Sequence, residues 1–236
     1  MKQLLLYIKF ALLFAIQNKT LKHIKQFKRW YSDMHSGKTT MSLGLPWMTY
    51  DAIDFLEEIT SKDKNVFEWG SGGSSIFFAS RCKQVSSVEH DKKWSKILKE
   101  KLHNLEIDNV ILQEIEGEKT DNFQDLNPEN ADDFVSKELK SAGLSYEKYA
   151  KAIDQFNLNY FDIIVVDGRV RNACVKRAIP HLKKGGYLIV DNSDRSYYLS
   201  EFNFLNNQNE WIKREFVGPV FFQHAFSKTS IFKKLF

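Results

Sequence analysis

Several features that define common classes of protein are scarce or absent in this sequence. The two cysteines, Cys82 and Cys174, have neither the spacing of a disulfide framework nor that of a zinc site, which indicates a reducing compartment. The apolar run at residues 4–16, interrupted only by Lys9, has 13 residues, fewer than the ~20 that a membrane-spanning helix needs. No small-x-small cleavage site follows this run, which argues against a secretory signal.

An excess of positive charge is also missing from most of the chain. The formal net charge is +4 over 236 residues, but residues 1–40 contain eight lysines and arginines and one acid, Asp33. Residues 41–236 therefore carry a net charge of −3. Nucleic acid is accordingly a weak candidate partner. The length suits one α/β domain with additions, and the many aromatic residues argue against disorder.

The N-terminal segment joins the apolar run at residues 4–16 to a basic segment, residues 19–29. Two interpretations stay open: a helix packed on the domain or on a partner, and an interfacial helix held to anionic lipid by its basic residues. We predict that residues 1–40 form a basic, partly apolar helical extension and that residues 1–30 make peripheral membrane contact if the second interpretation holds. The expected location is the cytoplasm, with the inner face of the membrane as an option.

Residues 65–69 indicate a buried strand that carries an acid, Glu68, near its end and leads into a glycine-rich turn, residues 70–75. Glycines let the backbone turn sharply and approach a ligand closely. The helix that follows directs its unpaired N–H groups toward the turn. The next apolar run ends in Glu89, 19 residues after Gly70, where a carboxylate can accept hydrogen bonds from ribose hydroxyls. The pattern predicts a nucleoside site, although a tight turn in an unrelated α/β protein would share part of it.

The turn departs from the dinucleotide fingerprint G-x-G-x-x-G, because Ser75 occupies its third glycine position. The pattern Glu-x-Gly-x-Gly instead resembles the first motif of class I S-adenosylmethionine (SAM)-dependent methyltransferases. The resemblance implies that Glu68 contacts the methionine ammonium, directly or through water, and that the glycines pass under the cofactor. The implied cofactor-binding residues are Glu68, Gly70, Ser71, Gly72, Ser74, Glu89, His90 and Asp167.

A second polar cluster follows two further apolar runs. Residues 161–166 lead to Asp167, Gly168 and Arg169, and residues 187–190 lead to Asp191 and Asn192. Ligands of open parallel sheets lie at the carboxyl ends of the strands. Four predicted strands thus end in or beside a carboxylate, which packing alone does not explain.

Asp167, Asp191 and Asn192 match the divalent-metal ligands of catechol-type O-methyltransferases, so the resemblance implies a Mg²⁺ or Mn²⁺ site at these residues, with a strand-end turn as the alternative. That family has a catalytic lysine where Val170 stands in this chain. The candidate catalytic residues are therefore Asp167, Arg169, Arg171 and Asp191, with the arginines suited to an anionic acceptor. Residues 191–195, Asp-Asn-Ser-Asp-Arg, also resemble a box shared by a group of small bacterial methyltransferase-like proteins.

The apolar pattern predicts an α/β fold. The resemblance implies a Rossmann-like doubly wound sheet of about seven strands, mostly parallel, with one antiparallel strand from a C-terminal hairpin. The methyltransferase-like domain would span residues 41–236, with the acidic stretch 117–143 as a lid or insertion. We expect the inner face of a helix at residues 91–104 to carry Trp94, Ile97, Leu98 and Leu102, with Asp91 as its N-cap. Two further helices are expected at residues 145–156 and 198–206.

Two functions are compatible with the sequence. The first is a SAM-dependent methyltransferase that acts on oxygen of a small or glycan-linked acceptor. The second is a SAM-fold binding or assembly protein without turnover, with a membrane surface as one location. The missing third glycine and the lack of a second catalytic domain disfavour an NAD-dependent oxidoreductase. The acceptor and the oligomeric state are left open.

Overall fold

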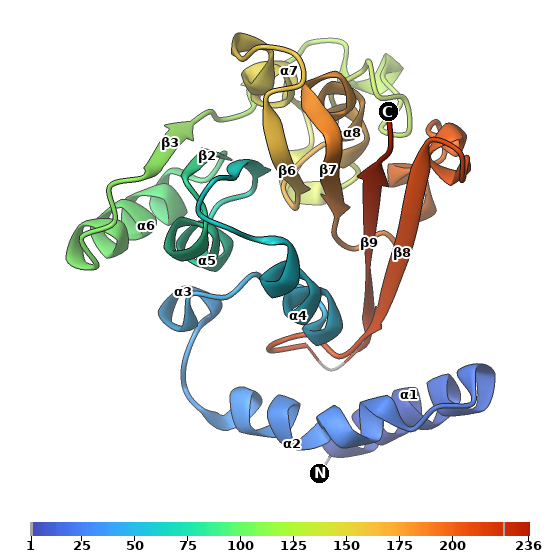
Figure 1. The fold of residues 1–236 in the computed structure, drawn as a ribbon. Helices are drawn as coiled ribbons and strands as arrows, with labels where there is room; N and C mark the ends of the chain where they lie inside the picture. The colour runs from blue at the N-terminus through green and yellow to red at the C-terminus, as the bar shows by residue number, and fades with distance from the viewer. Residues whose placement is uncertain (1, 224) are drawn as a thin grey trace.

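A seven-stranded sheet forms the middle layer of the molecule (Figure 1). The computed structural model describes residues 2–223 and 225–236. The strand order is β3-β2-β1-β6-β7-β9-β8. The strands are β1 (Asn65–Trp69), β2 (Gln84–Glu89), β3 (Val110–Glu114), β6 (Phe161–Val166), β7 (Leu182–Val190), β8 (Trp211–Gly218) and β9 (Ser227–Lys234).

The sheet is parallel except at β9, which pairs antiparallel with both β7 and β8. The predicted fold class, with its single antiparallel strand from a C-terminal hairpin, is confirmed. In β6, Ile163 and Val165 face one hydrophobic cluster while Ile164 and Val166 face another. A central strand buried on both faces explains why this run is apolar without interruption.

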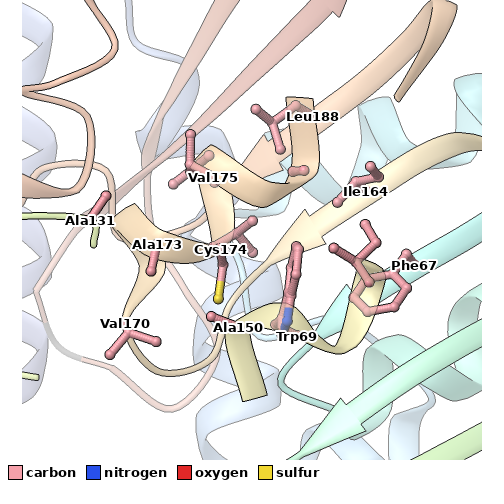
Figure 2. Packing of buried hydrophobic residues seen from close by; sticks show 14 of the residues in the cluster. Phe67, Trp69, Ala131, Ala150, Ile164, Val170, Ala173, Cys174, Val175 and Leu188 are labelled. Carbon is pink, nitrogen blue, oxygen red and sulfur yellow. The ribbon is translucent and has the colours of Figure 1, made fainter. Parts of the chain in front are cut away.

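Helices cover both faces of the sheet. The main helices are α4 (Tyr50–Ile59), α5 (Gly73–Arg81), α6 (Lys92–Asn104), α7 (Glu147–Ala150) and α8 (Arg171–His181). α8 packs with α7 on the face that holds Phe67 and Ile164 (Figure 2). α4 and α5 cover the face that holds Val66 and Ile163. The three layers are those of a doubly wound α/β fold.

Two N-terminal helices, α1 (Lys2–Asn18) and α2 (Lys22–His35), lie together at one end of the molecule (Figure 1). Tyr7 of α1 packs against Trp30 of α2, and both are buried in the cluster beneath α4. The indole of Trp30 donates a hydrogen bond to the carbonyl of Gln223 at 2.9 Å. One side of this helix pair is therefore packed on the domain. The domain boundary at residue 40 stays a prediction.

The short α3 (Thr40–Leu43) leads toward α4. The acidic segment 117–143 contains the strand β4 (Glu118–Lys119), which pairs with β5 (Leu144–Ser145), and two 3-10 turns, η1 (Phe123–Asp125) and η2 (Leu139–Ser141). Ala131 and Phe134 of this segment are buried in the core. The segment is therefore packed on the domain over this part.

Three local predictions were wrong or incomplete. Residues 198–206 form no α-helix but two 3-10 turns, η4 (Ser196–Tyr198) and η5 (Asn203–Asn206). The helix expected at 145–156 has only the four residues of α7, and a 3-10 turn, η3 (Lys151–Gln155), continues it. On α6, Asp91 is the N-cap as predicted, and Leu98 and Leu102 are buried, but Ile97 is half exposed.

Candidate functional site

A cavity of about 440 Å³ opens at the carboxyl ends of β1, β2, β6 and β7. Its volume lies within the range of small-molecule sites. The structure brings together in its lining every site residue predicted from the sequence except Glu68. These residues are Gly70, Ser71, Gly72, Ser74, Glu89, His90, Asp167, Arg169, Arg171, Asp191 and Asn192.

The glycine turn approaches the end of β6 closely. Gly70 has φ of +89°, and a Cβ built on it would lie 2.8 Å from the carbonyl carbon and oxygen of Asp167. Its backbone N–H donates to the carbonyl of Val88 at 2.9 Å. Gly70 therefore fixes the ends of three strands in one place, and a side chain there would separate them.

Gly70→Ala should lower the free energy of unfolding by about 2–5 kcal/mol, from left-handed strain of ~1–2 and overpacking of ~1–3. Gly185 provides a matched control, because it has φ of +79° with no other atom within 4 Å of a built Cβ. Gly185→Ala should cost only the strain. Urea unfolding of both variants measures the difference, and equal losses would show that the contact with Asp167 is unimportant.

Glu68 lies beneath the turn rather than in the cavity wall. Its side chain is fully buried, and its Oε1 accepts hydrogen bonds from the hydroxyls of Ser87, at 2.5 Å, and Ser75. Its Oε2 has no hydrogen-bond partner among the described residues. Burial raises the pKa of Glu68, against the hydrogen bonds from the serines. The contact with the methionine ammonium that the resemblance implied for Glu68, directly or through water, would have to reach this free oxygen past the turn.

Glu89 ties the end of β2 to the glycine turn. Its Oε2 accepts from the backbone N–H of Ser71 at 3.0 Å and from the Ser71 hydroxyl at 3.2 Å. Its Oε1 accepts from the backbone N–H groups of His90 and Asp91, both at 2.9 Å. Burial alone would raise the pKa of Glu89, but the hydrogen bonds from His90, Asp91 and Ser71 outweigh it and lower the pKa. Glu89 is therefore an ionised acceptor at the cavity wall.

Arg169 links three parts of the cavity wall. Its Nε donates to Nε2 of His90 at 2.9 Å, and its Nη1 pairs with Glu138 from the segment 117–143. Nδ1 of His90 lies 2.9 Å from Oε1 of Glu89. Since Nε2 accepts a hydrogen bond, the proton of a neutral His90 belongs on Nδ1, facing Glu89. The chain of contacts from Glu138 to Glu89 positions the guanidinium of Arg169 beside the cavity.

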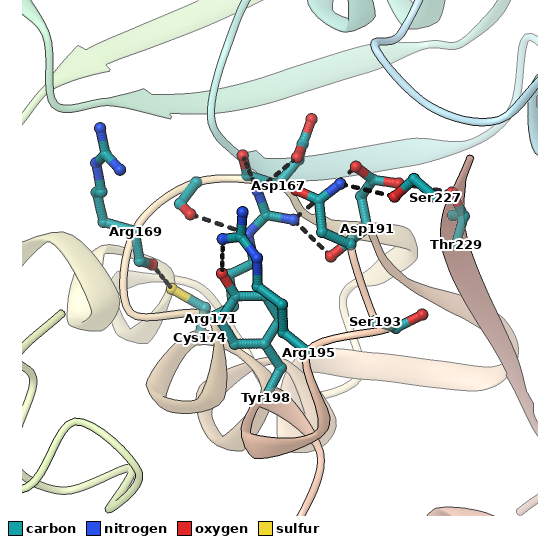
Figure 3. A network of polar contacts seen from close by, with 12 residues as sticks. Asp167, Arg169, Arg171, Cys174, Asp191, Ser193, Arg195, Tyr198, Ser227 and Thr229 are labelled. Atoms are coloured by element: carbon teal, nitrogen blue, oxygen red, sulfur yellow. Dashed lines mark hydrogen bonds and ion pairs between the residues drawn. The ribbon is translucent and has the colours of Figure 1, made fainter. Parts of the chain in front are cut away.

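Arg171 clamps the ends of β6 and β7 together (Figure 3). Its Nη2 lies 2.9 Å from Oδ1 of Asp167, and its Nη1 donates to the carbonyl of Asp191 at 2.5 Å. The same Nη1 lies 4.0 Å from Oδ2 of Asp191, and Nε donates to the carbonyl of Gly168 at 3.1 Å. All three guanidinium nitrogens are thus engaged within the protein. Arg171 is arranged to neutralise buried carboxylates rather than to bind an acceptor.

Two carboxyls share this one guanidinium. Oδ1 of Asp191 accepts from the hydroxyl of Thr229 at 2.6 Å, and the side chain is almost fully buried. Burial raises the pKa of Asp191, against the charge of Arg171. Burial likewise raises the pKa of Asp167 to about 8, again opposed by Arg171, and Asp191 adds to the rise. Asp167 lines the cavity, so a group that titrates near neutral pH faces it.

The metal site predicted at Asp167, Asp191 and Asn192 does not fit the structure. The positive charge between the two carboxyls is instead the guanidinium of Arg171, and the side-chain amide of Asn192 donates to the hydroxyl of Ser227 at 3.1 Å.

The cavity also contains residues that the sequence reasoning missed. Trp94 was assigned to the inner face of α6, but its indole N–H donates to the carbonyl of Ser71 at 2.7 Å and its ring borders the cavity. The Asp91 N-cap was the available signal, because it puts Trp94 in the first helical turn, beside the end of β2. Glu138 and Gln223 also line the cavity and come from loops that carry no motif.

Solved structures share this architecture. A Bacillus cereus O-methyltransferase in complex with S-adenosylhomocysteine (SAH) aligns over 87% of this chain and 96% of its own, with 13% identity and a TM-score of 0.55. The chain has the class I methyltransferase fold. A Klebsiella pneumoniae protein described as a candidate O-methyltransferase aligns over 100% of both chains, with 14% identity and a TM-score of 0.58. An rRNA methylase from Streptococcus thermophilus aligns over 85% of this chain and 99% of its own, with 14% identity and a TM-score of 0.54.

No protein-family model and no curated protein matches this sequence. At identities this low, the similar structures establish the fold, and function has to be argued from the cavity itself.

Proposed function

We propose that this protein is a SAM-dependent methyltransferase that methylates an oxygen atom of a small or glycan-linked acceptor. The observation that carries the proposal is the arrangement of the ionised Glu89, the Gly70 turn and Asp167 around one cavity. Two of the similar structures bear the description O-methyltransferase, one of them with SAH bound, and this supports oxygen as the methylated atom.

The residues present fit a SAM molecule. The cavity of about 440 Å³ has room for a nucleoside with an amino acid side chain. The backbone of the turn is exposed to it at Gly70 and Gly72, and the free Oε2 of Glu68 lies beneath the turn. A buried carboxylate is complementary to an ammonium group. Glu89 would accept hydrogen bonds from ribose hydroxyls once the Ser71 hydroxyl turns away.

When bound, SAM supplies a methyl group on a positively charged sulfur. The chain has to hold the acceptor in line and remove its proton. Asp167 is the candidate base, because it lines the cavity and its raised pKa, about 8, is suited to accepting a proton near neutral pH. Arg171 fixes the orientation of this carboxylate, and Arg169 presents positive charge to an anionic acceptor. Asp191 holds Arg171 in place rather than touching the acceptor.

A small acceptor also agrees with the charge of the domain. Residues 41–236 carry a net charge of −3, whereas a nucleic-acid site needs a basic surface. One similar structure is described as an rRNA methylase, but at 14% identity it supports only the fold. We propose a cytoplasmic enzyme that acts on small molecules or glycans.

Calorimetry with SAH tests the cofactor site. We expect a dissociation constant in the micromolar range for the wild type, no heat with NAD, and about 10- to 100-fold weaker SAH binding in Glu89→Ala, because a charged acceptor is lost. Glu114→Ala is the matched control, since Glu114 ends the neighbouring strand β3 but does not line the cavity. If Glu89→Ala bound SAH with wild-type affinity and had an unchanged melting temperature, Glu89 would not belong to the cofactor site. If the wild type bound SAH tightly but transferred no methyl group, the protein would be a SAM-binding protein without turnover.

A further inference from the structure

The helix α1 has two apolar faces, and only one of them is packed. Tyr7 and Ala11 are buried against α2 and the domain. On the opposite side, a stripe of five aliphatic side chains is exposed between 42% and 76%. These side chains are Leu5, Ile8, Leu12, Leu13 and Ile16. A helix that is apolar all round is normally covered on all sides. The outer stripe therefore needs a cover that the chain itself does not provide within its described residues.

The charges of this helix pair are also sorted by side. The basic residues nearest the domain are paired: Lys22 lies 2.7 Å from Asp51, and Arg29 lies 2.8 Å from Asp54. The one acid of residues 1–40, Asp33, accepts a hydrogen bond from Tyr50 at 2.8 Å.

Four further lysines are exposed, and none of them forms an ion pair with a described residue. They are Lys9, Lys19, Lys25 and Lys28. Lys25 and Lys28 lie on the side of α2 opposite the buried His23 and Trp30. The side of the helix pair that faces away from the domain is thus aliphatic and positively charged.

We propose that these five aliphatic residues and four lysines form a surface that docks on an anionic lipid bilayer. The aliphatic stripe would enter the boundary between headgroups and acyl chains, and the lysines would lie among the headgroups. Lys9, within the stripe, can extend its amine to the headgroups while its stem stays apolar. None of the described helices is long and apolar enough to cross a membrane, so α1 would lie in the plane of the interface.

The positive charge of this surface favours an anionic bilayer over a second copy of the chain or a nucleic acid. Residues 1–40 carry a net charge of +7, so two copies of this surface would repel one another across a dimer interface. A nucleic acid would use the lysines but would leave the five aliphatic side chains exposed. An anionic membrane complements both features.

Co-sedimentation of the full chain with vesicles tests this proposal. Binding is expected to phosphatidylcholine vesicles that contain about one-third phosphatidylglycerol, to fall in high salt, and to be weak on phosphatidylcholine alone. The variant Ile8→Glu/Leu12→Glu should bind at least about tenfold more weakly, because acids replace the aliphatic contact. Lys25→Gln/Lys28→Gln should lose about fivefold per lysine at low salt.

The matched control is Leu105→Glu/Ile111→Glu, which removes two aliphatic residues of similar exposure, 44% and 50%, far from α1 in the sequence. It should bind vesicles like the wild type. Docking does not depend on the proposed methyl transfer, and Ile8→Glu/Leu12→Glu should keep wild-type affinity for SAH, which also shows that it is folded. Equal vesicle binding by this variant and the wild type would overturn the proposal, as would a concentration-dependent dimer that the substitutions abolish.

Discussion

Asp167→Asn should lower the rate of methyl transfer by about 100- to 10,000-fold, the usual contribution of a general base. The asparagine keeps the size of the side chain but cannot accept the proton of the acceptor. Asp167 contacts Arg171 and lines the cavity, and SAH binding should survive within a few-fold. The assay follows a labelled methyl group from SAM into small-molecule and glycan fractions of a cell extract.

The pH profile separates a base from a merely structural carboxylate. Because burial raises the pKa of Asp167 to about 8, and a base acts in its ionised form, kcat/KM of the wild type should rise with pH through this value. The residual activity of Asp167→Asn should lose that rise. The control is Asp132→Asn, because Asp132 forms an exposed ion pair with Lys176 of α8 at 2.6 Å. Full activity in Asp167→Asn would end the assignment of Asp167 as the base.

Arg171→Ala should destabilise the protein by about 3–5 kcal/mol, because it leaves the buried carboxyl of Asp191 and the partly buried carboxyl of Asp167 without their countercharge. The control on the same helix is Arg177→Ala, which removes a partly exposed pair with Asp154 at 3.2 Å and should cost at most about 1 kcal/mol. Urea unfolding measures both.

The loss in Arg171→Ala should grow with pH. Burial raises the folded-state pKa of both carboxyls above that of the unfolded chain, so the folded state binds more protons and the free energy of unfolding falls as pH rises. Between the ordinary carboxyl pKa of ~3.9 and about 8, Asp167 keeps its proton in both folded proteins, so the free energies of unfolding of the wild type and the variant fall in parallel. The Arg171 charge opposes the rise in the pKa of Asp167, so its removal raises this pKa further. Unfolding at pH 8 and above it should therefore show the larger loss at the higher pH. A loss that is independent of pH would contradict the shared countercharge.

The same variant tests the metal prediction. With Arg171 removed, the two carboxyls could bind a cation, so terbium luminescence should appear in Arg171→Ala and be absent from the wild type. Activity of the wild type should be unchanged by EDTA. Terbium binding by the wild type at Asp167 would show that Arg171 does not fill the cation position.

The sheet could be predicted from the sequence because its signals are local. The apolar runs at residues 65–69 and 161–166 are short and end at polar residues or glycines, and a parallel sheet brings such ends to one edge. Nine of the eleven predicted residues that line the cavity follow from this rule, since they end strands or lie in the turns after them. The other two, Ser74 and Arg171, lie in the first turns of α5 and α8.

Side-chain pairing was not predictable in the same way. The sequence placed Arg171 near an acceptor, but only the fold shows that its nitrogens are engaged by Asp167, Asp191 and Gly168. Glu68 has the right position in the motif, yet Ser75 and Ser87 hold it beneath the turn. Spacing along the chain does not determine which groups neutralise one another after folding.

Helix prediction failed where tertiary contacts replaced helical periodicity. A helix was expected at residues 198–206, but two separate 3-10 turns form there, and Phe202 and Leu205 are buried in the core. Trp94 satisfied the apolar pattern of α6, yet its indole N–H donates a hydrogen bond to the carbonyl of Ser71 at the cavity. An aromatic ring with a polar edge can serve a cavity wall as well as a core.

The most direct test of the central claim, that this cavity binds SAM for methyl transfer, is a crystal structure of the protein with SAH. We predict the ribose hydroxyls within hydrogen-bond distance of Glu89, the amino acid end over the turn at Gly70 and Gly72, and the sulfur facing Asp167. SAH bound elsewhere, or the cavity closed to SAH and filled by a different nucleotide, would contradict the account.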